Sequence, residues 1–80
     1  MNEKFKEILA NVNSEILDDP DLDLVEDGII DSLDIMTIIS DCEEAFEIDF
    51  DPDDVMPENF ASAETIWALV QKYMEEKNAE

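Results

Sequence analysis

The chain has no histidine and only one cysteine, Cys42, among its 80 residues. Without histidine, no Ser-His or Cys-His pair can activate a nucleophile, and the commonest metal ligand in proteins is missing. A lone cysteine also excludes an internal disulfide framework. These absences argue against a self-contained hydrolase, and we expect a protein that is not an enzyme and has no metal site.

Positive charge is nearly as scarce as histidine. The chain has 24 aspartates and glutamates against 4 basic residues, all lysine, which gives a net charge of −20. The lysines lie near the two ends of the chain, at Lys4, Lys6, Lys72 and Lys77. Such a chain has no basic patch to displace counterions from phosphates, and an anionic membrane surface repels it. We therefore expect no nucleic-acid or membrane partner and predict that basic proteins bind it.

Long apolar runs are also missing, and the chain has a single glycine. No segment approaches the length of a membrane span, and the N-terminal segment shows no signal-peptide pattern, so we expect a cytoplasmic protein. A length of 80 residues suits one compact domain over residues 1–80, and we expect a monomer. A domain of this size buries roughly 60% of its unfolded surface, which leaves little room for a deep pocket.

Apolar residues recur at helical intervals, which an acidic disordered chain would not show. The spacing predicts a first helix over about residues 3–17, with an inward stripe of Phe5, Ile8, Leu9, Val12 and Ile16. Asp18-Asp19-Pro20 should end this helix, because proline disfavours helical geometry in the residue before it. A polar stretch then runs to Ile30, and we expect its scattered apolar residues to pin this loop to the core.

A second helix is predicted to begin at Asp31. The Asp31 side chain can accept a hydrogen bond from a free amide of the first turn, and Asp34 adds negative charge where the helix dipole favours it. The inward stripe consists of Ile35, Ile38, Ile39, Cys42 and Phe46. We expect the Cys42 thiol to be buried and unreactive, since neighbouring acids raise a thiol pKa. Leu33 and Met36 lie beside this stripe, so the helix has enough apolar surface for two contact faces.

Two further helices complete the predicted fold. Asp51-Pro52 is typical of a helix start, but Pro57 limits that third helix to little more than one turn. Ser62 is a candidate cap for the last helix, which gives way to a polar tail near Glu75. The inward stripe of the last helix consists of Ala63, Ile66, Trp67, Val70, Tyr73 and Met74. The sequence therefore predicts an all-α fold, a four-helix bundle with a short third helix.

Alternating aspartates occur twice, at residues 19–23 and 49–53, and raise the question of calcium. An EF-hand loop needs glycine at its sixth position and glutamate at its twelfth. These positions hold Leu24 and Ile30 in the first run, and Asp54 and Phe60 in the second. We interpret both runs as solvated acidic loops. An acidic helical interaction module, calcium-responsive or structural, that binds a basic partner is the alternative hypothesis for function.

Ser32 follows Asp31 in the first turn of the second predicted helix, where a hydroxyl is exposed. Serine is common at helix starts as a cap, but here Asp31 already supplies the cap. No histidine or lysine lies nearby in sequence, so Ser32 is a poor catalytic nucleophile and an accessible site for modification by another enzyme. A phosphodiester at Ser32 would meet free backbone amides at the positive end of the helix dipole.

The segment Asp31-Ser32-Leu33-Asp34, followed by an acidic helix ending in Glu43-Glu44-Ala45-Phe46, resembles the acyl carrier protein family. The position of the motif, the length and the acidity agree with this resemblance over nearly the whole chain. The resemblance implies that a separate, magnesium-dependent phosphopantetheinyl transferase attaches 4′-phosphopantetheine from coenzyme A to Ser32, flanked by Asp31 and Leu33. The thiol of this arm would carry acyl or aminoacyl groups as thioesters, as in fatty acid or related biosynthesis.

The resemblance also implies a docking face on the second helix. Its partners would be the transferase and the loading and synthase enzymes, through basic docking surfaces. By position, the face maps to Leu33, Met36, Ser40, Glu43 and Glu44.

Three departures from the fatty-acid type of carrier concern the cargo. Gly28-Ile29-Ile30 precedes the Asp-Ser pair where a small residue is usual, Thr37 replaces an acidic residue, and Cys42 replaces leucine. The approach to the serine is more similar to D-alanyl carriers or to stand-alone carriers of peptide and polyketide pathways. The sequence leaves the cargo open among these. An enzyme using paired carboxylates is a third hypothesis, but the chain offers neither a cleft nor a group to act opposite the acids.

Overall fold

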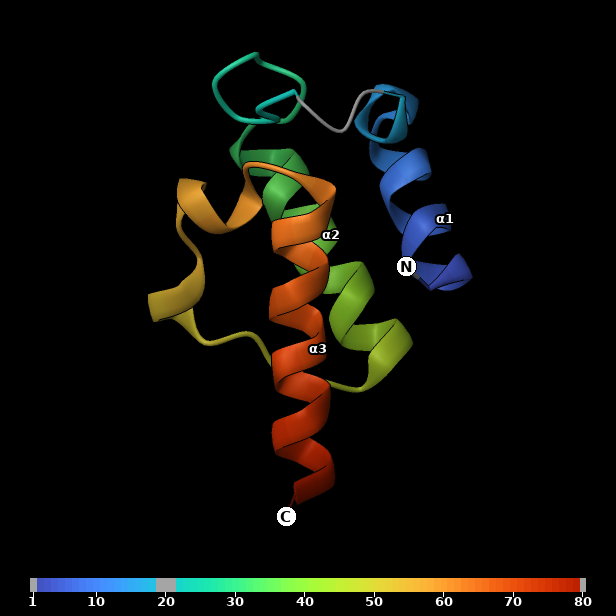
Figure 1. Cartoon of the computed structure of the whole chain (residues 1–80), viewed down its shortest axis with the longest axis vertical. Helices are drawn as coiled ribbons and strands as arrows, with labels where there is room; N and C mark the ends of the chain where they lie inside the picture. Colours follow the sequence, from blue (N-terminus) through green and yellow to red (C-terminus); the bar gives the residue numbers. More distant parts are fainter. Residues whose placement is uncertain (1, 19–21, 80) are drawn as a thin grey trace.

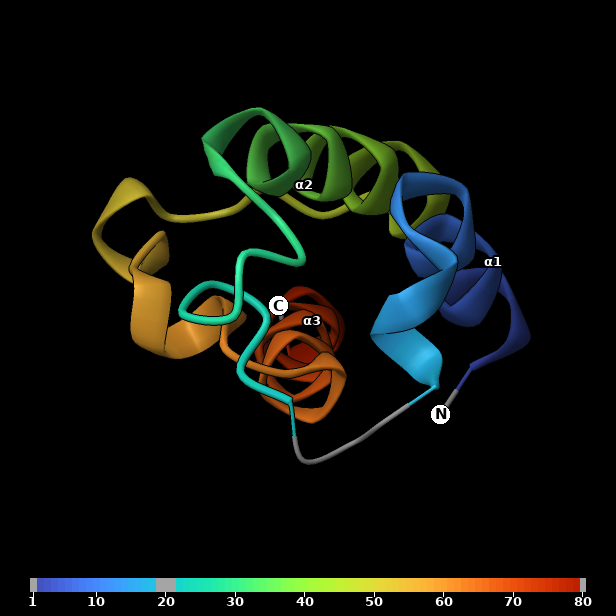
Figure 2. The same ribbon diagram turned by 90° about the horizontal axis from the view of Figure 1, so that it is seen from above.

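The computed structural model describes residues 2–18 and 22–79, and these ranges contain helices joined by loops. The elements are α1 (Glu3–Val12), η1 (Ser14–Leu17), α2 (Ser32–Phe46), η2 (Pro52–Asp54), η3 (Pro57–Phe60) and α3 (Ala63–Ala79), where η denotes a 3-10 helix. α1 packs against α2, and η3 packs against α3 (Figure 1). Seen from above, α1, α2 and the η2–η3 segment surround α3 (Figure 2). No strand occurs in the described ranges, so the predicted all-α class is confirmed.

The first helix is shorter than the apolar spacing predicts. α1 ends at Val12, and Asn13 adopts an extended conformation with φ −162°. η1 then begins at Ser14, with the Asn13 side chain as its cap. The predicted single helix over residues 3–17 is therefore wrong. An asparagine side chain can bond nearby backbone amides and so interrupt a helix, and the spacing of apolar residues does not reveal this. Ile16 still reaches the core, and the predicted stop at Asp19 and Pro20 lies outside the described residues.

The second helix begins where the sequence predicts. Ile38 and Cys42 are fully buried, and Ile35, Ile39 and Phe46 pack half-buried against the core. The predicted inward stripe is therefore confirmed.

The predicted short third helix is replaced by two 3-10 helices. η2 begins at Pro52, after Asp51 accepts a hydrogen bond from the Asp53 amide at 2.9 Å, as expected of a cap. Met56 is extended, with φ −130° and ψ 148°, because the ring of Pro57 disfavours helical geometry in the preceding residue. The described ranges thus contain three α-helices, and the predicted four-helix bundle is not confirmed.

The last helix is capped as predicted and extends further than predicted. Ser62 Oγ accepts a hydrogen bond from the Thr65 amide at 3.1 Å, and Thr65 Oγ1 accepts one from the Ser62 amide at 3.1 Å. The helix runs on to Ala79, past the polar tail expected near Glu75, because glutamate and lysine favour helix even without apolar periodicity. Neither α3 nor any other helix in the described ranges is long and apolar enough to cross a membrane.

Aromatic side chains join the three α-helices. The ring centroids of Phe5 in α1 and Trp67 in α3 lie 4.9 Å apart, and Phe46 of α2 lies 6.0 Å from the same tryptophan. Phe50 lies 5.1 Å from Tyr73. Trp67 and Tyr73 are therefore core aromatic residues, as predicted.

Two weakly acidic groups in the core make the stability of the protein sensitive to alkaline pH. Burial, and then the charges of Asp41 and Glu43, raise the pKa of Cys42 from 9.0 to about 12. Burial, and then the hydrogen bond to Asp54, raise the pKa of Tyr73 from 10.0 to about 12. Between the ordinary and the raised pKa values, the two groups lose their protons in the unfolded chain but keep them in the folded chain. We therefore expect the free energy of unfolding to fall as the pH rises from 9.0 towards 12.

Urea unfolding followed by circular dichroism across this pH range measures the slope. Cys42→Ala removes one of the two groups and should make the slope shallower. Ser40→Ala, at an exposed position of the same helix, removes no titrating group of this kind and should leave the slope unchanged. A free energy of unfolding that stays constant across the range would contradict the prediction.

Candidate functional site

Ser32 is the first residue of α2 and lies at the surface of the molecule. Its neighbour Asp31 caps the helix, because Asp31 Oδ1 accepts a hydrogen bond from the Asp34 amide at 3.0 Å. Asp34 Oδ2 in turn accepts one from the Asp31 amide at 3.2 Å, which completes a capping box. The predicted capping role of Asp31 and the predicted place of Asp34 in the first turn are confirmed. Since the cap is complete without Ser32, its hydroxyl is not needed to hold the start of the helix.

The backbone at the start of α2 suits a phosphate group on Ser32. The Ile35 amide donates the first hydrogen bond of the helix, to the Asp31 carbonyl at 3.0 Å. The amides of Ser32 and Leu33 precede it and have no acceptor within the helix. Together with the helix dipole, these amides would offset part of the repulsion between a phosphate on Ser32 and the carboxylates of Asp31 and Asp34. The exposed hydroxyl and the two amides therefore fit a group attached through a phosphodiester.

The site supplies no histidine or lysine that could activate Ser32. The chain contains no histidine, and its lysines lie in α1 and α3. Lys72 and Lys77 of α3 form ion pairs with Asp54 and Glu47, at 3.5 Å and 3.6 Å. The carboxylates nearest to Ser32, those of Asp31 and Asp34, each accept a backbone hydrogen bond of the capping box, so we expect the base for a reaction at Ser32 to come from another protein.

The loop before Ser32 is held by buried side chains and backbone hydrogen bonds. Leu24 and Ile30 are buried, and the Ile30 amide donates to the Leu24 carbonyl at 2.9 Å. The Leu24 amide donates to the Ala61 carbonyl at 2.7 Å, which ties the loop to the residues before α3. Gly28 turns the chain with φ 72°, a conformation that other residues rarely adopt. The expectation that apolar residues pin this loop is confirmed.

Four of the five residues mapped to the docking face are exposed along one side of α2. Leu33 and Met36 are 73% and 66% exposed, which is high for large apolar side chains. Ser40 and Glu44 are exposed on the same side, because residues three or four apart are neighbours on a helix surface. This side of α2 thus presents an apolar pair close to Ser32 and an acidic group further along the helix.

Glu43 lies apart from these four residues. Its Oε2 accepts a hydrogen bond from the Phe50 amide at 3.0 Å, and the residue is half-buried. Glu43 therefore holds the loop that follows α2. Two adjacent glutamates in the sequence give no signal that one of them makes this contact.

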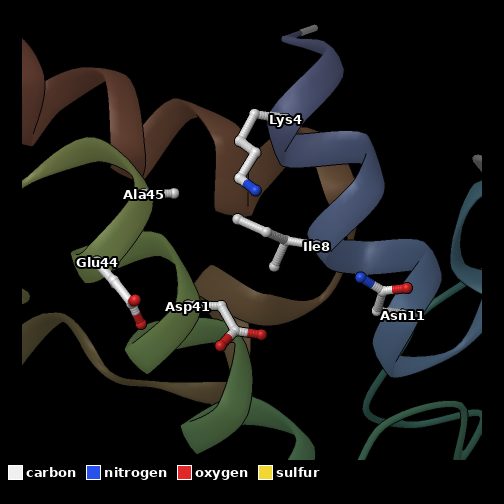
Figure 3. Close-up of a pocket in the computed structure, with 6 residues that line it drawn as sticks. All are labelled: Lys4, Ile8, Asn11, Asp41, Glu44 and Ala45. Carbon is white, nitrogen blue, oxygen red and sulfur yellow. The ribbon is translucent and has the colours of Figure 1, made fainter.

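An open groove of about 400 Å³ lies between α1 and α2 (Figure 3). It is lined by Lys4, Ile8, Asn11, Asp41, Glu44 and Ala45. The ammonium group of Lys4 points into the groove from α1, and the carboxylates of Asp41 and Glu44 line it from α2 (Figure 3). The groove therefore places one further acidic group, Asp41, on the flank of α2 beside Glu44, opposite Lys4 of α1.

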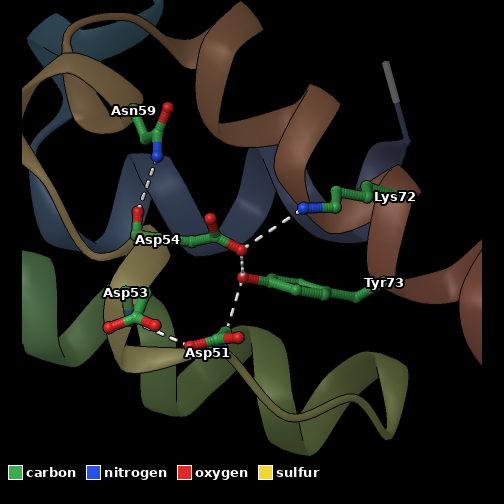
Figure 4. A network of polar contacts seen from close by, with 6 residues as sticks. All are labelled: Asp51, Asp53, Asp54, Asn59, Lys72 and Tyr73. Carbon is green, nitrogen blue, oxygen red and sulfur yellow. Dashed lines mark hydrogen bonds and ion pairs between the residues drawn. The ribbon is translucent and has the colours of Figure 1, made fainter.

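A polar network fastens η2 to α3 (Figure 4). The Tyr73 hydroxyl donates to Asp54 Oδ2 at 2.5 Å and accepts from the Asp51 amide at 3.2 Å. Lys72 Nζ lies 3.5 Å from the same Asp54 oxygen, and Asn59 Nδ2 donates to the Asp54 carbonyl at 2.7 Å. The hydrogen bond from Tyr73, with the charge of Lys72, holds the pKa of Asp54 below its usual value. In the described part of the chain, no three His, Cys, Asp or Glu side chains are grouped to hold a metal ion.

Asp31→Ala should lower the free energy of unfolding by about 1 kcal/mol, because it removes the cap of α2. Glu26→Ala is the matched control, because it removes the same charge from an exposed loop position. Urea unfolding of both variants checks the prediction. Equal stability of the two variants would show that the capping box adds nothing.

The fold and the site describe a small helical protein with an exposed serine at the start of its second α-helix. The family model for the phosphopantetheine attachment site matches residues 3–71. The chain belongs to this family of carrier proteins, and it carries a covalently attached 4′-phosphopantetheine. The resemblance to carrier proteins seen in the sequence is thereby confirmed.

Curated relatives of the chain include D-alanyl carrier proteins of Lactococcus lactis. The protein from subsp. lactis strain IL1403 is 35% identical over 78 residues, which cover 95% of this chain and 99% of the relative. The protein from subsp. cremoris strain MG1363 is 33% identical with the same coverage. No solved structure gives a significant match.

Proposed function

We propose that Ser32 carries the phosphopantetheine arm and that a phosphopantetheinyl transferase attaches it. The observation that carries this proposal is the exposed Ser32 hydroxyl at the start of α2, within the matched residues and beside a cap that does not use it. Asp31 and Leu33 flank the attachment point, Asp31 as the cap and Leu33 through its amide.

The transfer forms a bond between Ser32 Oγ and the phosphorus next to the pantetheine group of coenzyme A. The pyrophosphate bond of coenzyme A breaks, and the adenine nucleotide leaves with the bonding electron pair. A base on the transferase takes the hydroxyl proton, because the carboxylates beside Ser32 are bound in the capping box and the site has no histidine. The arm then supplies a thiol that holds cargo as a thioester. Intact mass before and after incubation with the transferase, magnesium and coenzyme A tests the proposal, and an unchanged mass would contradict it.

We propose a D-alanyl group as the cargo. The named relatives are D-alanyl carrier proteins that match over 99% of their own length. The Gly28-Ile29-Ile30 approach to the site agrees with this choice. An aminoacyl thioester also bears an ammonium group at neutral pH, which a chain of net charge −20 attracts. These observations favour an aminoacyl group over the fatty acyl groups that the sequence resemblance also allows.

Cargo released from the protein of its native cells tests this assignment. Hydroxylamine cleaves the thioester and yields the hydroxamate of the cargo, which chiral chromatography and mass spectrometry identify. D-alanine hydroxamate would support the proposal, and a fatty acyl or different aminoacyl hydroxamate would contradict it. Protein treated with alkali before hydroxylamine is the control, because its thioester is already hydrolysed.

We propose that partner enzymes dock on the side of α2 formed by Leu33, Met36, Ser40 and Glu44. The apolar pair near Ser32 supplies the contact, and Glu44 attracts basic residues of the partner. The sequence resemblance also placed Glu43 here, but charge reversal of Glu43 would break its bond to the Phe50 amide. Glu44 is therefore the residue that tests the charge of the face.

Met36→Ala and Glu44→Lys should weaken transferase binding in different ways. Loss of an apolar anchor should raise the dissociation rate constant about tenfold, with little change in salt dependence. Charge reversal should instead slow association severalfold and flatten its salt dependence, because rim charges steer the encounter. Stopped-flow binding to the transferase at several salt concentrations separates the two effects.

Glu64→Lys, at an exposed position in the first turn of α3, is the matched control for Glu44→Lys. It changes net charge equally and should slow association less. Equal slowing by both changes would assign the effect to net charge. If Met36→Ala and Glu44→Lys both bind the transferase with the rate constants of the wild type, the docking face lies elsewhere.

A further inference from the structure

Asn13 stands between α1 and η1, and all of its polar groups form hydrogen bonds. Its amide donates to the Leu9 carbonyl at 2.9 Å, and its carbonyl accepts from the Ile16 amide at 3.1 Å. Its side-chain Oδ1 accepts from the Glu15 amide at 2.9 Å. The remaining group, Nδ2, donates to the Ile29 carbonyl at 3.0 Å, across a sequence separation of 16 residues. Asn13 therefore links the end of α1 to the loop that leads into Ser32.

The peptide group between Ile29 and Ile30 is held at both of its polar atoms. Its oxygen accepts the hydrogen bond from Asn13 Nδ2 at 3.0 Å, and its N–H donates to the Leu24 carbonyl at 2.9 Å. A peptide group is planar, so two opposed hydrogen bonds determine its orientation. The Ile30 side chain is also buried, and only Asp31 separates Ile30 from Ser32. A small rotation of this peptide group would therefore be passed on to the start of α2.

We propose that Asn13 is a positioning residue for Ser32, which sets where the Ser32 hydroxyl lies when the transferase docks. This inference rests on the proposed role of Ser32 as the attachment residue. The position requires an acceptor for the Glu15 amide and a donor for the Ile29 carbonyl on one short side chain. Asparagine has both groups, whereas aspartate lacks the donor and serine is too short to reach Ile29.

Three variants separate the link to Ile29 from other effects. Asn13→Asp keeps the acceptor that caps η1 but places a second oxygen against the Ile29 carbonyl. Asn13→Ser keeps a capping oxygen and adds no charge, but its side chain cannot reach the Ile29 carbonyl. If Asn13→Asp does not fold, Asn13→Ser still tests the hydrogen bond to Ile29. Asn11→Asp is the matched control, because it makes the same chemical change at an exposed position of α1.

The assay is single-turnover modification by coenzyme A with the transferase in excess. We expect both Asn13 variants to lower the saturating rate constant about tenfold, because the hydroxyl is displaced from the transferred phosphorus. The half-saturating transferase concentration should stay unchanged, since Leu33, Met36 and Glu44 are untouched. Irreversibly misfolded protein would lower the reaction amplitude instead, and reversible unfolding would raise the half-saturating concentration, so both are distinguished from a positioning effect.

Amide hydrogen exchange supplies a second readout. In both Asn13 variants the Ile30 amide should exchange faster, because its peptide group has lost one of its two hydrogen bonds. The Ile38 amide, in the middle of α2, should exchange as in the wild type. Asn11→Asp should change neither.

The outcomes distinguish this inference from the function on which it rests. Asn13 variants that react at the rate of Asn11→Asp would overturn the positioning role and leave Ser32 as the attachment residue. A fall in amplitude with an unchanged rate constant would likewise overturn it. A wild-type protein that gains no mass on Ser32 would overturn both proposals together.

Discussion

Ser32→Ala should abolish attachment of phosphopantetheine and leave the helical content and melting behaviour of the protein nearly unchanged. The hydroxyl that would form the phosphodiester is gone, whereas the cap of α2 is supplied by Asp31 and Asp34. Alanine also has a high helix propensity at the first turn. Intact mass spectrometry after incubation with a phosphopantetheinyl transferase and coenzyme A measures the loss, and circular dichroism measures the fold.

Ser14→Ala is the matched control for this substitution. Ser14 is also exposed and is the first residue of a helix that the preceding side chain caps, but it belongs to η1 and not to the proposed docking face on α2. This variant should be modified at the wild-type rate. A mass gain in Ser32→Ala would move the attachment to another hydroxyl, and peptide mapping of the adduct would then identify that residue.

Phe5→Ala should lower the free energy of unfolding by about 3 to 5 kcal/mol. Phe5 is fully buried, and its ring lies 4.9 Å from that of Trp67, so its removal opens a cavity between α1 and α3. Domains of this kind have a total stability of only about 5 to 15 kcal/mol. The loss should therefore bring the protein close to unfolding. Urea unfolding followed by circular dichroism and by the fluorescence of Trp67 measures the change.

Glu7→Ala is the control for Phe5→Ala, because it shortens an exposed side chain two residues further along α1. Its effect should stay within about 0.5 kcal/mol. If both substitutions cost the same, the contact between α1 and α3 would not contribute to the core as the ring geometry indicates.

The sequence by itself determined the helical class, the starts of the α-helices and the candidate attachment residue. These features depend on interactions within one or two helical turns. The caps at Asp31 and Ser62 bond amides three residues away, and the inward stripes follow from the helical period. The Asp-Ser motif is likewise contained in four consecutive residues. Local signals of this kind are readable from the chain alone.

The spacing of apolar residues predicted the ends of two helices wrongly. It predicted one helix through residues 3–17, although the Asn13 side chain ends α1 and caps η1. It likewise ended the last helix near Glu75, although the helix continues to Ala79 with Lys77 Nζ donating to the Glu47 carbonyl at 2.8 Å. Both errors arise because polar side chains also decide where a helix begins and ends.

Only the tertiary structure decided which polar residues hold distant segments together. Glu43 accepts from the Phe50 amide, Asn13 donates to Ile29 and Tyr73 donates to Asp54, across separations of 7, 16 and 19 residues. The partner in such a long-range hydrogen bond depends on which segments the packed core brings side by side. An acidic chain contains many carboxylates that could accept the same bond, so the sequence does not identify the one that does. For the same reason, two adjacent glutamates on α2 have different roles: Glu43 is turned to its own loop, and Glu44 is left exposed.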